Sequence, residues 1–214
     1  MKAISLLSRR LDLSKDAFRS YYEDNHSPLA MRHFPYRRYT RNHLVEDVQG
    51  LDFDCISESQ MMPGFDTREM MHSRSRQLMV EDERRFMRPE KIRVALAQEF
   101  LLLDAEEHAQ TGYQRRHALL LSRAGLRRDE FRQRAERWAQ ALHRDVCELR
   151  QISLDLLTPV AGSDFPFDGV LWLSMPEQTR PLLALPGMVI ASIAVHTHAS
   201  SVQELQRNFV AYLP

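Results

Sequence analysis

The chain has 214 residues, enough for one large domain or for two modules of about a hundred residues each. Its 29 Lys and Arg balance 29 Asp and Glu, so it lacks the basic excess on which nucleic-acid binders depend. No stretch is long and apolar enough to span a membrane, and the N-terminus lacks the pattern of a signal peptide. We therefore expect a cytoplasmic protein with no nucleic-acid partner and no membrane contact.

The first half alternates between strand and helix patterns. In chain order, the predicted elements are a strand at 3–8, a helix from the N-cap Ser14 to His33, strands at 36–46 and 53–61, a helix at 67–87 and a strand at 92–103. This βαββαβ order is the ferredoxin-like arrangement. A polar segment at 104–114 without hydrophobic period then predicts a boundary.

The pattern starts again after this boundary. His117–Arg123 matches Lys2–Arg9, and Phe131 and the pair Phe167-Asp168 match Phe18 and Phe53-Asp54 at a nearly constant offset. The predicted elements are a helix to about Leu142, strands near 146–157 and 167–174, a short helix, a strand at 188–196 and a helical tail from 202 that docks on the body.

The repeat predicts how the molecule is organised. We expect an α+β fold in which two ferredoxin-like βαββαβ repeats pack as a pseudo-dimeric α+β barrel. Residues 1–103 would be the repeat that carries a pocket, and residues 115–214 a degenerate second repeat plus a C-terminal helix. Because the second sheet can cover the apolar face of the first, no partner subunit is needed to complete the barrel, and we expect a monomer or a homodimer.

A histidine stands within the apolar stripe of the first predicted helix. Helical spacing places Phe18, Tyr22, His26, Leu29 and His33 on one side, whereas Arg19, Glu23 and Asn25 fall elsewhere. An imidazole titrates near neutral pH and is suited to general acid/base catalysis. The same position also suits a core histidine with satisfied hydrogen bonds, or one that caps the helix before Pro28.

The second repeat provides an internal comparison for this histidine. Aligning the two repeats puts Ala139 opposite His26 and Trp172 opposite Glu58. The first repeat thus keeps ionisable groups where the second has apolar ones. We interpret this asymmetry as one polar pocket in the first repeat, with His26 lining a largely apolar cavity, and a filled scaffold in the second.

The first half contains several motifs that stand in a recognisable order: Phe18-x-x-Tyr21-Tyr22, His26-x-Pro28-Leu29, Tyr39-x-x-Asn42-His43, Phe53-Asp54-x-x-x-Glu58 and Asp82-Glu83-x-x-Phe86. Together these motifs resemble the EthD-domain family, which belongs to the dimeric α+β barrel superfamily. The resemblance covers about residues 1–103, and the second half resembles a degenerate copy without the His-x-Pro-Leu element. It implies a pocket between the first helix and its sheet, and relatives that include cofactor-free enzymes acting on small cyclic substrates.

The leading prediction is a cofactor-independent lyase or isomerase (of decarboxylase, dehydratase or cyclase type) acting on a hydrophobic small molecule such as an aromatic polyketide or a lactone. His26 would transfer a proton, Tyr39 or His43 would polarise a carbonyl or phenol, and Glu58 would orient an imidazole. Tyr22 and Asn42 would contact the substrate.

No cofactor is expected, and no metal either. His196 and His198 share one face of a strand, a pair that can ligate a metal, but no third ligand stands nearby in the sequence. Two alternatives stay open: a non-catalytic small-molecule-binding accessory protein, and a cofactor-free oxygenase or haem-linked partner on the same barrel. The sequence leaves open whether the protein is an enzyme.

Overall fold

The computed structural model describes residues 1–104, 112–146, 148–175, 187–208 and 213. The first half contains β1 (Lys2–Leu7), α1 (Lys15–Tyr21), a π-helical turn (Tyr22–His26), α2 (Ser27–His33), β2 (Tyr36–Leu44), β3 (Cys55–Met61), α3 (Thr67–Met70), α4 (Arg74–Phe86), a 3-10 turn (Pro89–Lys91) and β4 (Arg93–Asp104). The second contains β5 (Gly112–Leu121), α5 (Arg128–Asp145), β6 (Gln151–Pro159), β7 (Gly169–Ser174), β8 (Val189–Ala199) and α6 (Val202–Asn208).

The strands close into one antiparallel barrel in the order β1-β3-β2-β8-β5-β7-β6-β4. Each repeat contributes four strands in the same ferredoxin-like order, β4-β1-β3-β2 in the first and β8-β5-β7-β6 in the second. This confirms the predicted α+β fold of two repeats packed as a pseudo-dimeric barrel. The two sheets face each other across the barrel interior, and their edges also hydrogen-bond, β2 to β8 and β4 to β6.

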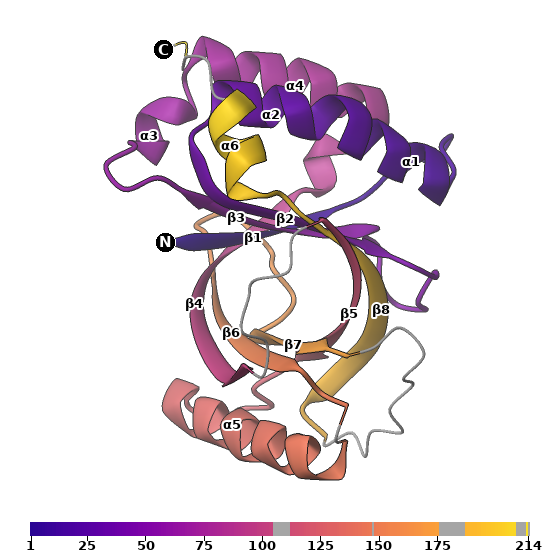
Figure 1. Ribbon diagram of the computed structural model, residues 1–214, viewed down its shortest axis with the longest axis vertical. Coiled ribbons are helices and arrows are strands. Elements are labelled where there is room, and N and C mark those ends of the chain that lie inside the picture. The colour runs from indigo at the N-terminus through magenta and orange to yellow at the C-terminus, as the bar shows by residue number, and fades with distance from the viewer. Residues whose placement is uncertain (105–111, 147, 176–186, 209–212, 214) are drawn as a thin grey trace.

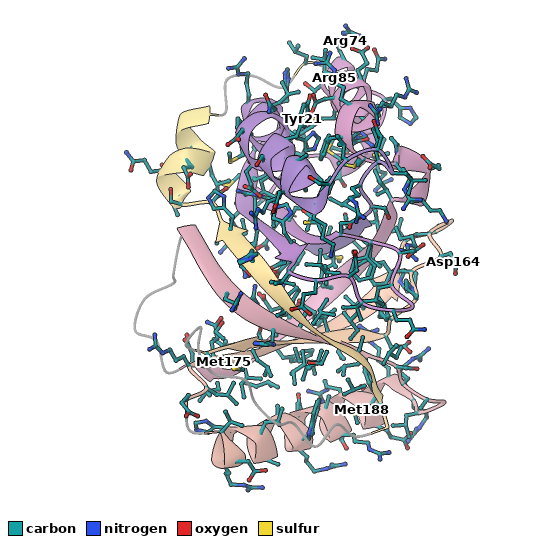
Figure 2. All side chains as sticks on the ribbon, turned by 90° about the vertical axis from the view of Figure 1, so that its right-hand side faces the viewer. Tyr21, Arg74, Arg85, Asp164, Met175 and Met188 are labelled. Carbon is teal, nitrogen blue, oxygen red and sulfur yellow. The ribbon has the colours of Figure 1, made fainter. Side chains whose placement is uncertain are left out.

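The helices cover two opposite sides of the barrel (Figure 1). α1, α2 and α4 lie over the strands β1 to β3, and α5 lies on the far side, against β6 and β7. Hydrophobic side chains form one core inside the barrel and one core under each helical layer. In the side view of Figure 2, Met175 and Met188 mark the core above α5. Among the described residues, no helix is long and apolar enough to cross a membrane.

Most predicted elements occur where the sequence places them. The hydroxyl of Ser14 caps α1 by accepting from the backbone N–H of Ala17 at 3.1 Å. The segment 67–87, predicted as one helix, is instead two, because Ser73 caps a new helix by accepting from the backbone N–H of Arg76. The short helix predicted after β7 and the tail beyond Asn208 lie outside the described residues, apart from Leu213.

The first helical segment differs from its counterpart α5 in having a π-helical turn. The N–H of Ser27 bonds the carbonyl of Tyr22, five residues earlier, whereas α5 is an α-helix throughout. The wider turn brings Glu23 against the sheet, where it is only 9% exposed. The prediction that Glu23 falls outside the buried stripe is therefore wrong, because it assumed a regular helical period.

Gly169, the first residue of β7, lies against Phe131 of α5 and against the backbone of β6. A Cβ atom there would lie 3.1 Å from the backbone oxygen of Asp155 and 3.2 Å from the ring of Phe131. We expect Gly169→Ala to lower the free energy of unfolding by roughly 1–3 kcal/mol, as overpacking does. Urea denaturation would measure this, with Gly187→Ala as control, because no described atom lies within 4 Å of a Cβ placed at Gly187. Equal stability of the two variants would contradict the expectation.

Candidate functional site

The six residues predicted for the site lie on two different sides of the sheet. Tyr22, His26, Tyr39 and His43 lie between the first repeat's helices and strands, on the side called here the helix-facing side. Asn42 and Glu58 point into the barrel interior, which we call the lumen, where they bond each other at 2.9 Å. Alternation along β2 and β3 separates the two groups, so they cannot form one site.

A buried carboxylate organises the helix-facing side. Glu23 accepts a hydrogen bond from His43 Nε2 at 2.6 Å and another from His198 Nδ1 at 2.7 Å. The guanidinium of Arg41 adds contacts at 2.7 and 3.1 Å to the same oxygen as His198. We call these four residues the Glu23 cluster. It joins the π-helical turn to β2 of the same repeat and to β8 of the other.

The hydrogen bonds of the cluster set its protonation states. Burial would raise the pKa of Glu23, but the donors His198, His43 and Arg41 outweigh burial and lower that pKa well below its ordinary value. Burial lowers the pKa of His43, and the neighbouring Glu23 only partly opposes this. Because a carboxylate can only accept, a neutral His43 must carry its proton on Nε2. Its Nδ1 is buried, and no described residue forms a hydrogen bond with it.

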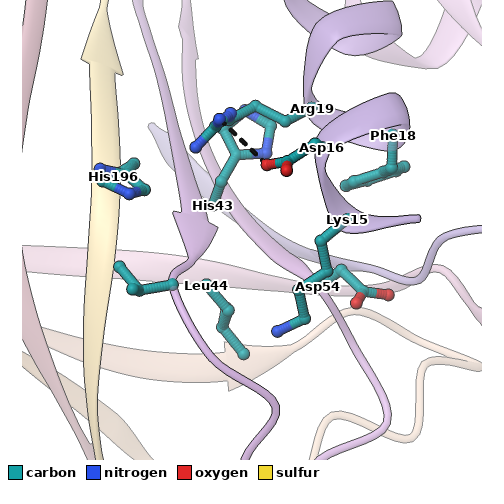
Figure 3. Close-up of a pocket in the computed structure, with 9 residues that line it drawn as sticks. Lys15, Asp16, Phe18, Arg19, His43, Leu44, Asp54 and His196 are labelled. Atoms are coloured by element: carbon teal, nitrogen blue, oxygen red, sulfur yellow. Dashed lines mark hydrogen bonds and ion pairs between the residues drawn. The ribbon is translucent and has the colours of Figure 1, made fainter.

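His43 lies in the wall of a cleft of about 180 Å³ between α1 and the strands β2 and β8 (Figure 3). The other lining residues are Lys15, Asp16, Phe18, Arg19, Leu44, Val45, Asp54 and His196. Charged side chains at its entrance are paired, Lys15 with Asp47 at 3.0 Å and Arg19 with Asp16 at 3.1 Å. The cleft is therefore more polar than the apolar cavity that the sequence predicts. Of the predicted site residues, only His43 lines it.

His26 is held in a different environment. Its Nδ1 lies 2.8 Å from a carboxylate oxygen of Asp82 on α4, and the other oxygen of Asp82 accepts from the hydroxyl of Tyr21 at 2.8 Å. Phe86 packs against the imidazole at 5.0 Å between ring centres. His26 lines neither of the two best-formed clefts in the described part of the chain, so the prediction that it lines an apolar cavity is not met there.

The two predicted tyrosines form a buried pair. The hydroxyl of Tyr39 lies 3.1 Å from that of Tyr22, and Tyr39 stacks on Tyr36 at 4.6 Å. Burial raises the pKa of both Tyr22 and Tyr39, which keeps the phenols protonated. Neither lines the cleft. The polarising role of Tyr39 and the substrate contact of Tyr22 therefore stay predictions.

Glu58 belongs to a network of polar side chains in the lumen. Its oxygens contact Lys2 at 2.6 Å and Arg116 at 2.9 Å, in addition to Asn42. The prediction that Glu58 orients an imidazole is wrong, because these partners lie on the lumen side. Glu23 and Asp82 are the carboxylates that bond the imidazoles instead. Lys2 also contacts Glu99 and Asp155, and Trp172 donates to Asp155 at 2.8 Å.

The strand registers allow the two repeats to be compared residue by residue. The pairs Arg41–Ser57 and His43–Cys55 of the first repeat correspond to Leu154–Leu171 and Leu156–Gly169 of the second. Ala139, opposite His26, lies in an entirely apolar core under α5. The predicted asymmetry thus holds on the helix-facing side. It fails in the lumen, where the second repeat keeps Arg116 and Asp155 as buried charged residues.

No group of side chains among the described residues has the arrangement of a metal site. His198, considered above as a metal ligand, bonds Glu23.

Comparison with known proteins identifies part of the chain. Residues 10–90 match the family model of the EthD domain. We call them the EthD region. It contains α1, α2, β2, β3 and α4, and with them Glu23, Arg41, His43, His26 and Asp82. His196 and His198 lie outside it, in the second repeat. No curated protein matches the chain.

Solved structures resemble the chain only distantly. The crystal structure of a protein described as a monooxygenase from Lactobacillus acidophilus NCFM is 10% identical, with a TM-score of 0.49, and the match covers 94% of this chain and 93% of that one. A structure described as a chlorite dismutase is 11% identical, also with a TM-score of 0.49, over 97% and 99% of the two chains. Likeness at this level says nothing about the reaction of this chain.

Sequence reasoning missed three residues of the Glu23 cluster. The π-helical turn removes Glu23 from the regular helical period, Arg41 has no signal beyond its place in the strand predicted at 36–46, and the spacing of His196 and His198 suggests only a metal site. Asp82 stood in a motif of the EthD region without a role. The sequence signal that could have indicated His198 is the pair of histidines in the last strand, β8, because closure of the barrel brings β8 beside β2.

We expect His26→Ala to lower the free energy of unfolding by roughly 1–3 kcal/mol, because it leaves the buried carboxylate of Asp82 with one partner fewer. Thermal unfolding should show a melting temperature several degrees lower. His72→Ala, which alters an exposed histidine, is the matched control. An unchanged melting temperature would contradict the structural role that the Asp82 contact indicates for His26.

The lumen network should make stability depend on pH. Burial raises the pKa of Asp155 to about 6, an effect that Lys2 only partly offsets. An aspartate with a raised pKa binds its proton more tightly in the folded chain. Its contribution to stability is therefore full below the unfolded pKa of about 4 and is lost as the pH rises through 6.

Asp155→Asn removes this titration. Between pH 5 and pH 7, wild type should lose about 1 kcal/mol of unfolding free energy relative to the variant. Carboxylates with lowered pKa values, such as Glu23, have the opposite trend at lower pH and are common to both proteins. Urea titrations at pH 5, 6 and 7 measure the difference, with the exposed Asp145→Asn as control. Parallel pH profiles for wild type and Asp155→Asn would exclude this source of pH dependence.

Proposed function

We propose that the protein is a lyase or isomerase in which His43 is the general base for a small molecule bound in the cleft. One observation carries the proposal: Nδ1 of His43 is buried and has no hydrogen-bond partner among the described residues, while Glu23 holds Nε2 at 2.6 Å. A neutral imidazole fixed in this way offers one free lone pair at a defined place. The proposal moves the role of base from His26 to His43. The chemistry needs only proton transfer, so it requires no cofactor.

The comparison of the repeats supports a functional role for His43. Leu156 occupies the corresponding strand position in the second repeat, and it is buried among apolar side chains. The fold therefore does not need an imidazole at this position. Burying polar and charged groups is costly unless every partner is in place, so an apolar residue would be the simpler way to stabilise the interface. A buried imidazole with an unused nitrogen is better explained by chemistry than by packing.

The cleft supports a specific reaction sequence. A proton on carbon next to a carbonyl passes to Nδ1 of His43, while the Nε2–H remains bonded to Glu23. The negative charge that develops on the carbonyl oxygen faces Lys15 and Arg19, which line the same cleft. The imidazolium then returns the proton to the far carbon of a C=C bond conjugated with the enolate, giving a double-bond isomer, or to a leaving group that departs from the carbon next to the deprotonated one, giving elimination.

The volume of the cleft favours a small substrate. Sites for drug-sized ligands usually occupy about 300–1,000 Å³, whereas this cleft has about 180 Å³. Of the two substrate classes predicted from the sequence, a single-ring lactone therefore fits better than a multi-ring aromatic polyketide. A non-catalytic binding protein would use the same cleft and differ only in lacking turnover.

His43→Gln tests the proposal, because a glutamine amide can still donate to Glu23 but is not a base. We expect a loss of about a hundred- to ten-thousandfold in rate, the usual range for a general base. The assay is deuterium incorporation from D₂O into butenolides and single-ring cyclic ketones, followed by proton NMR. Thermal unfolding should show a folded variant with a melting temperature near that of wild type.

His72→Gln is the matched control and should exchange deuterium at the wild-type rate, since His72 is exposed and is not one of the residues that line the cleft. Wild-type rates in His43→Gln would refute the catalytic role of His43. Binding of these compounds by wild type without any exchange would instead favour the binding-protein alternative.

A further inference from the structure

The second repeat contributes an imidazole to the site of the first. β8 pairs with β2 so that His198 stands opposite Arg41 and His196 opposite His43. Residues directly opposite in an antiparallel pair project their side chains to the same face. Closure of the barrel thus brings two histidines from outside the EthD region to this site, His198 as a member of the Glu23 cluster and His196 opposite His43.

His198 and His43 hold the same carboxylate from opposite ends. Nδ1 of His198 lies 2.7 Å from Oε2 of Glu23, and Nε2 of His43 lies 2.6 Å from Oε1. Together with Arg41, which contacts the same oxygen as His198 at 2.7 and 3.1 Å, these contacts keep the carboxylate turned toward His43. The orientation of Glu23 in turn decides which nitrogen of His43 carries the proton, and therefore which nitrogen is free to act as base.

Other contacts fix the end of β8 in this position. The hydroxyl of Ser200 lies 2.6 Å from Nη1 of Arg41, and the backbone N–H of Ser200 donates to the carbonyl of Tyr39 at 3.0 Å. Among the described residues, Arg41 on β2 and Glu204 on α6 are further charged groups near His198. Of the acidic groups Glu23 and Glu204, Glu23 is bonded to His198 directly.

The barrel contains a second crossing of the same kind, between β4 and β6, which serves as an internal control. There Phe100 stands opposite Leu154, in the places that His198 and Arg41 occupy at the β2–β8 crossing. An apolar pair therefore suffices to close the barrel. The polar pair at the β2–β8 crossing is not required by the closure itself.

We propose that His198 is a positioning residue for His43: by donating its Nδ1–H to Glu23, it fixes the carboxylate that selects the Nε2–H tautomer of His43. This inference rests on the proposed function, in which the free Nδ1 of His43 is the base. It also means that the active site is composed of both repeats, and that the second repeat is more than a scaffold.

The test compares His198→Phe with His198→Asn in the full chain. Phenylalanine occurs at the equivalent position of the other crossing and donates no hydrogen bond. Asparagine retains a donor close to the position of Nδ1. The readout is the tautomer and pKa of His43, followed by ¹⁵N-detected NMR of the histidine rings over pH 5 to 9, with His43→Gln used to assign the signals. His117→Phe on β5, a half-buried histidine outside the cluster, is the control.

In wild type and in His198→Asn, we expect His43 to be in the Nε2–H form when neutral. In His198→Phe, Glu23 loses a donor and becomes more basic, so the pKa of His43 should rise by roughly half a unit to one unit and the Nδ1–H form should appear. An unchanged His43 in His198→Phe would overturn the proposal. So would equal changes in both variants, which would show that the imidazole charge, and not the donor, matters.

This readout is independent of turnover. If His43→Gln keeps its activity, the proposed function fails while the coupling of His198 to His43 can still be measured. If His198→Phe leaves the His43 ring unchanged, the positioning role fails and the general base is untouched. Should His198→Phe not fold, His198→Ala provides the same loss of donor with less bulk.

Discussion

The hydrogen bonding of exposed strand edges is the constraint on which this structure depends. A four-stranded ferredoxin-like sheet ends in two edges whose backbone groups need partners. Here each repeat satisfies the edges of the other, β2 with β8 and β4 with β6. The barrel closes within one chain, and its closure fixes the register between the repeats. The register between β2 and β8 brings His198 to Glu23. The residues that make up the candidate site therefore depend on how the strand edges of the two repeats pair.

The duplicated architecture shows two physical solutions for the same interface between helix and sheet. Under α5 the interface is built from apolar side chains such as Leu154, Leu156 and Leu171. Under α1 the corresponding strand positions hold Arg41, His43 and Ser57, and a charged carboxylate is buried beside them. Because removing one partner from such a group leaves an uncompensated buried charge, the polar interface is the more demanding of the two. Its presence in one repeat alone indicates a site.

Inside the barrel, the two repeats have a hydrogen bond at the same place but form it with different residues. In the first repeat Asn42 donates to Glu58, and at the corresponding place in the second Trp172 donates to Asp155. The donor lies on β2 and the acceptor on β3 in the first repeat, whereas in the second the donor lies on β7, the counterpart of β3, and the acceptor on β6, the counterpart of β2. Arg116, the counterpart of Lys2, stacks on Trp172 at 4.4 Å while it pairs with Glu58 of the other repeat. The lumen is thus a shared polar layer across the pseudo-twofold axis, and it ties the two halves together by charge as well as by strand pairing.

The sequence by itself determined the elements, their βαββαβ order, the duplication and the resemblance of its first half to the EthD family, because hydrophobic periods and local caps such as Ser14 are encoded over short distances. It also identified His43 as a site candidate and the lack of a polar counterpart for His26 in the second repeat. The tertiary structure alone decided the rest. The π-helical turn interrupts the regular helical period and so buries Glu23. Strand alternation places Glu58 on the opposite side of the sheet from the imidazoles. The β2–β8 register brings His198 next to Glu23. These three features depend on which strands become neighbours when the barrel closes, or on a local departure from regular helix geometry. The spacing of residues along the chain does not reveal strand pairing of this kind or an irregular turn.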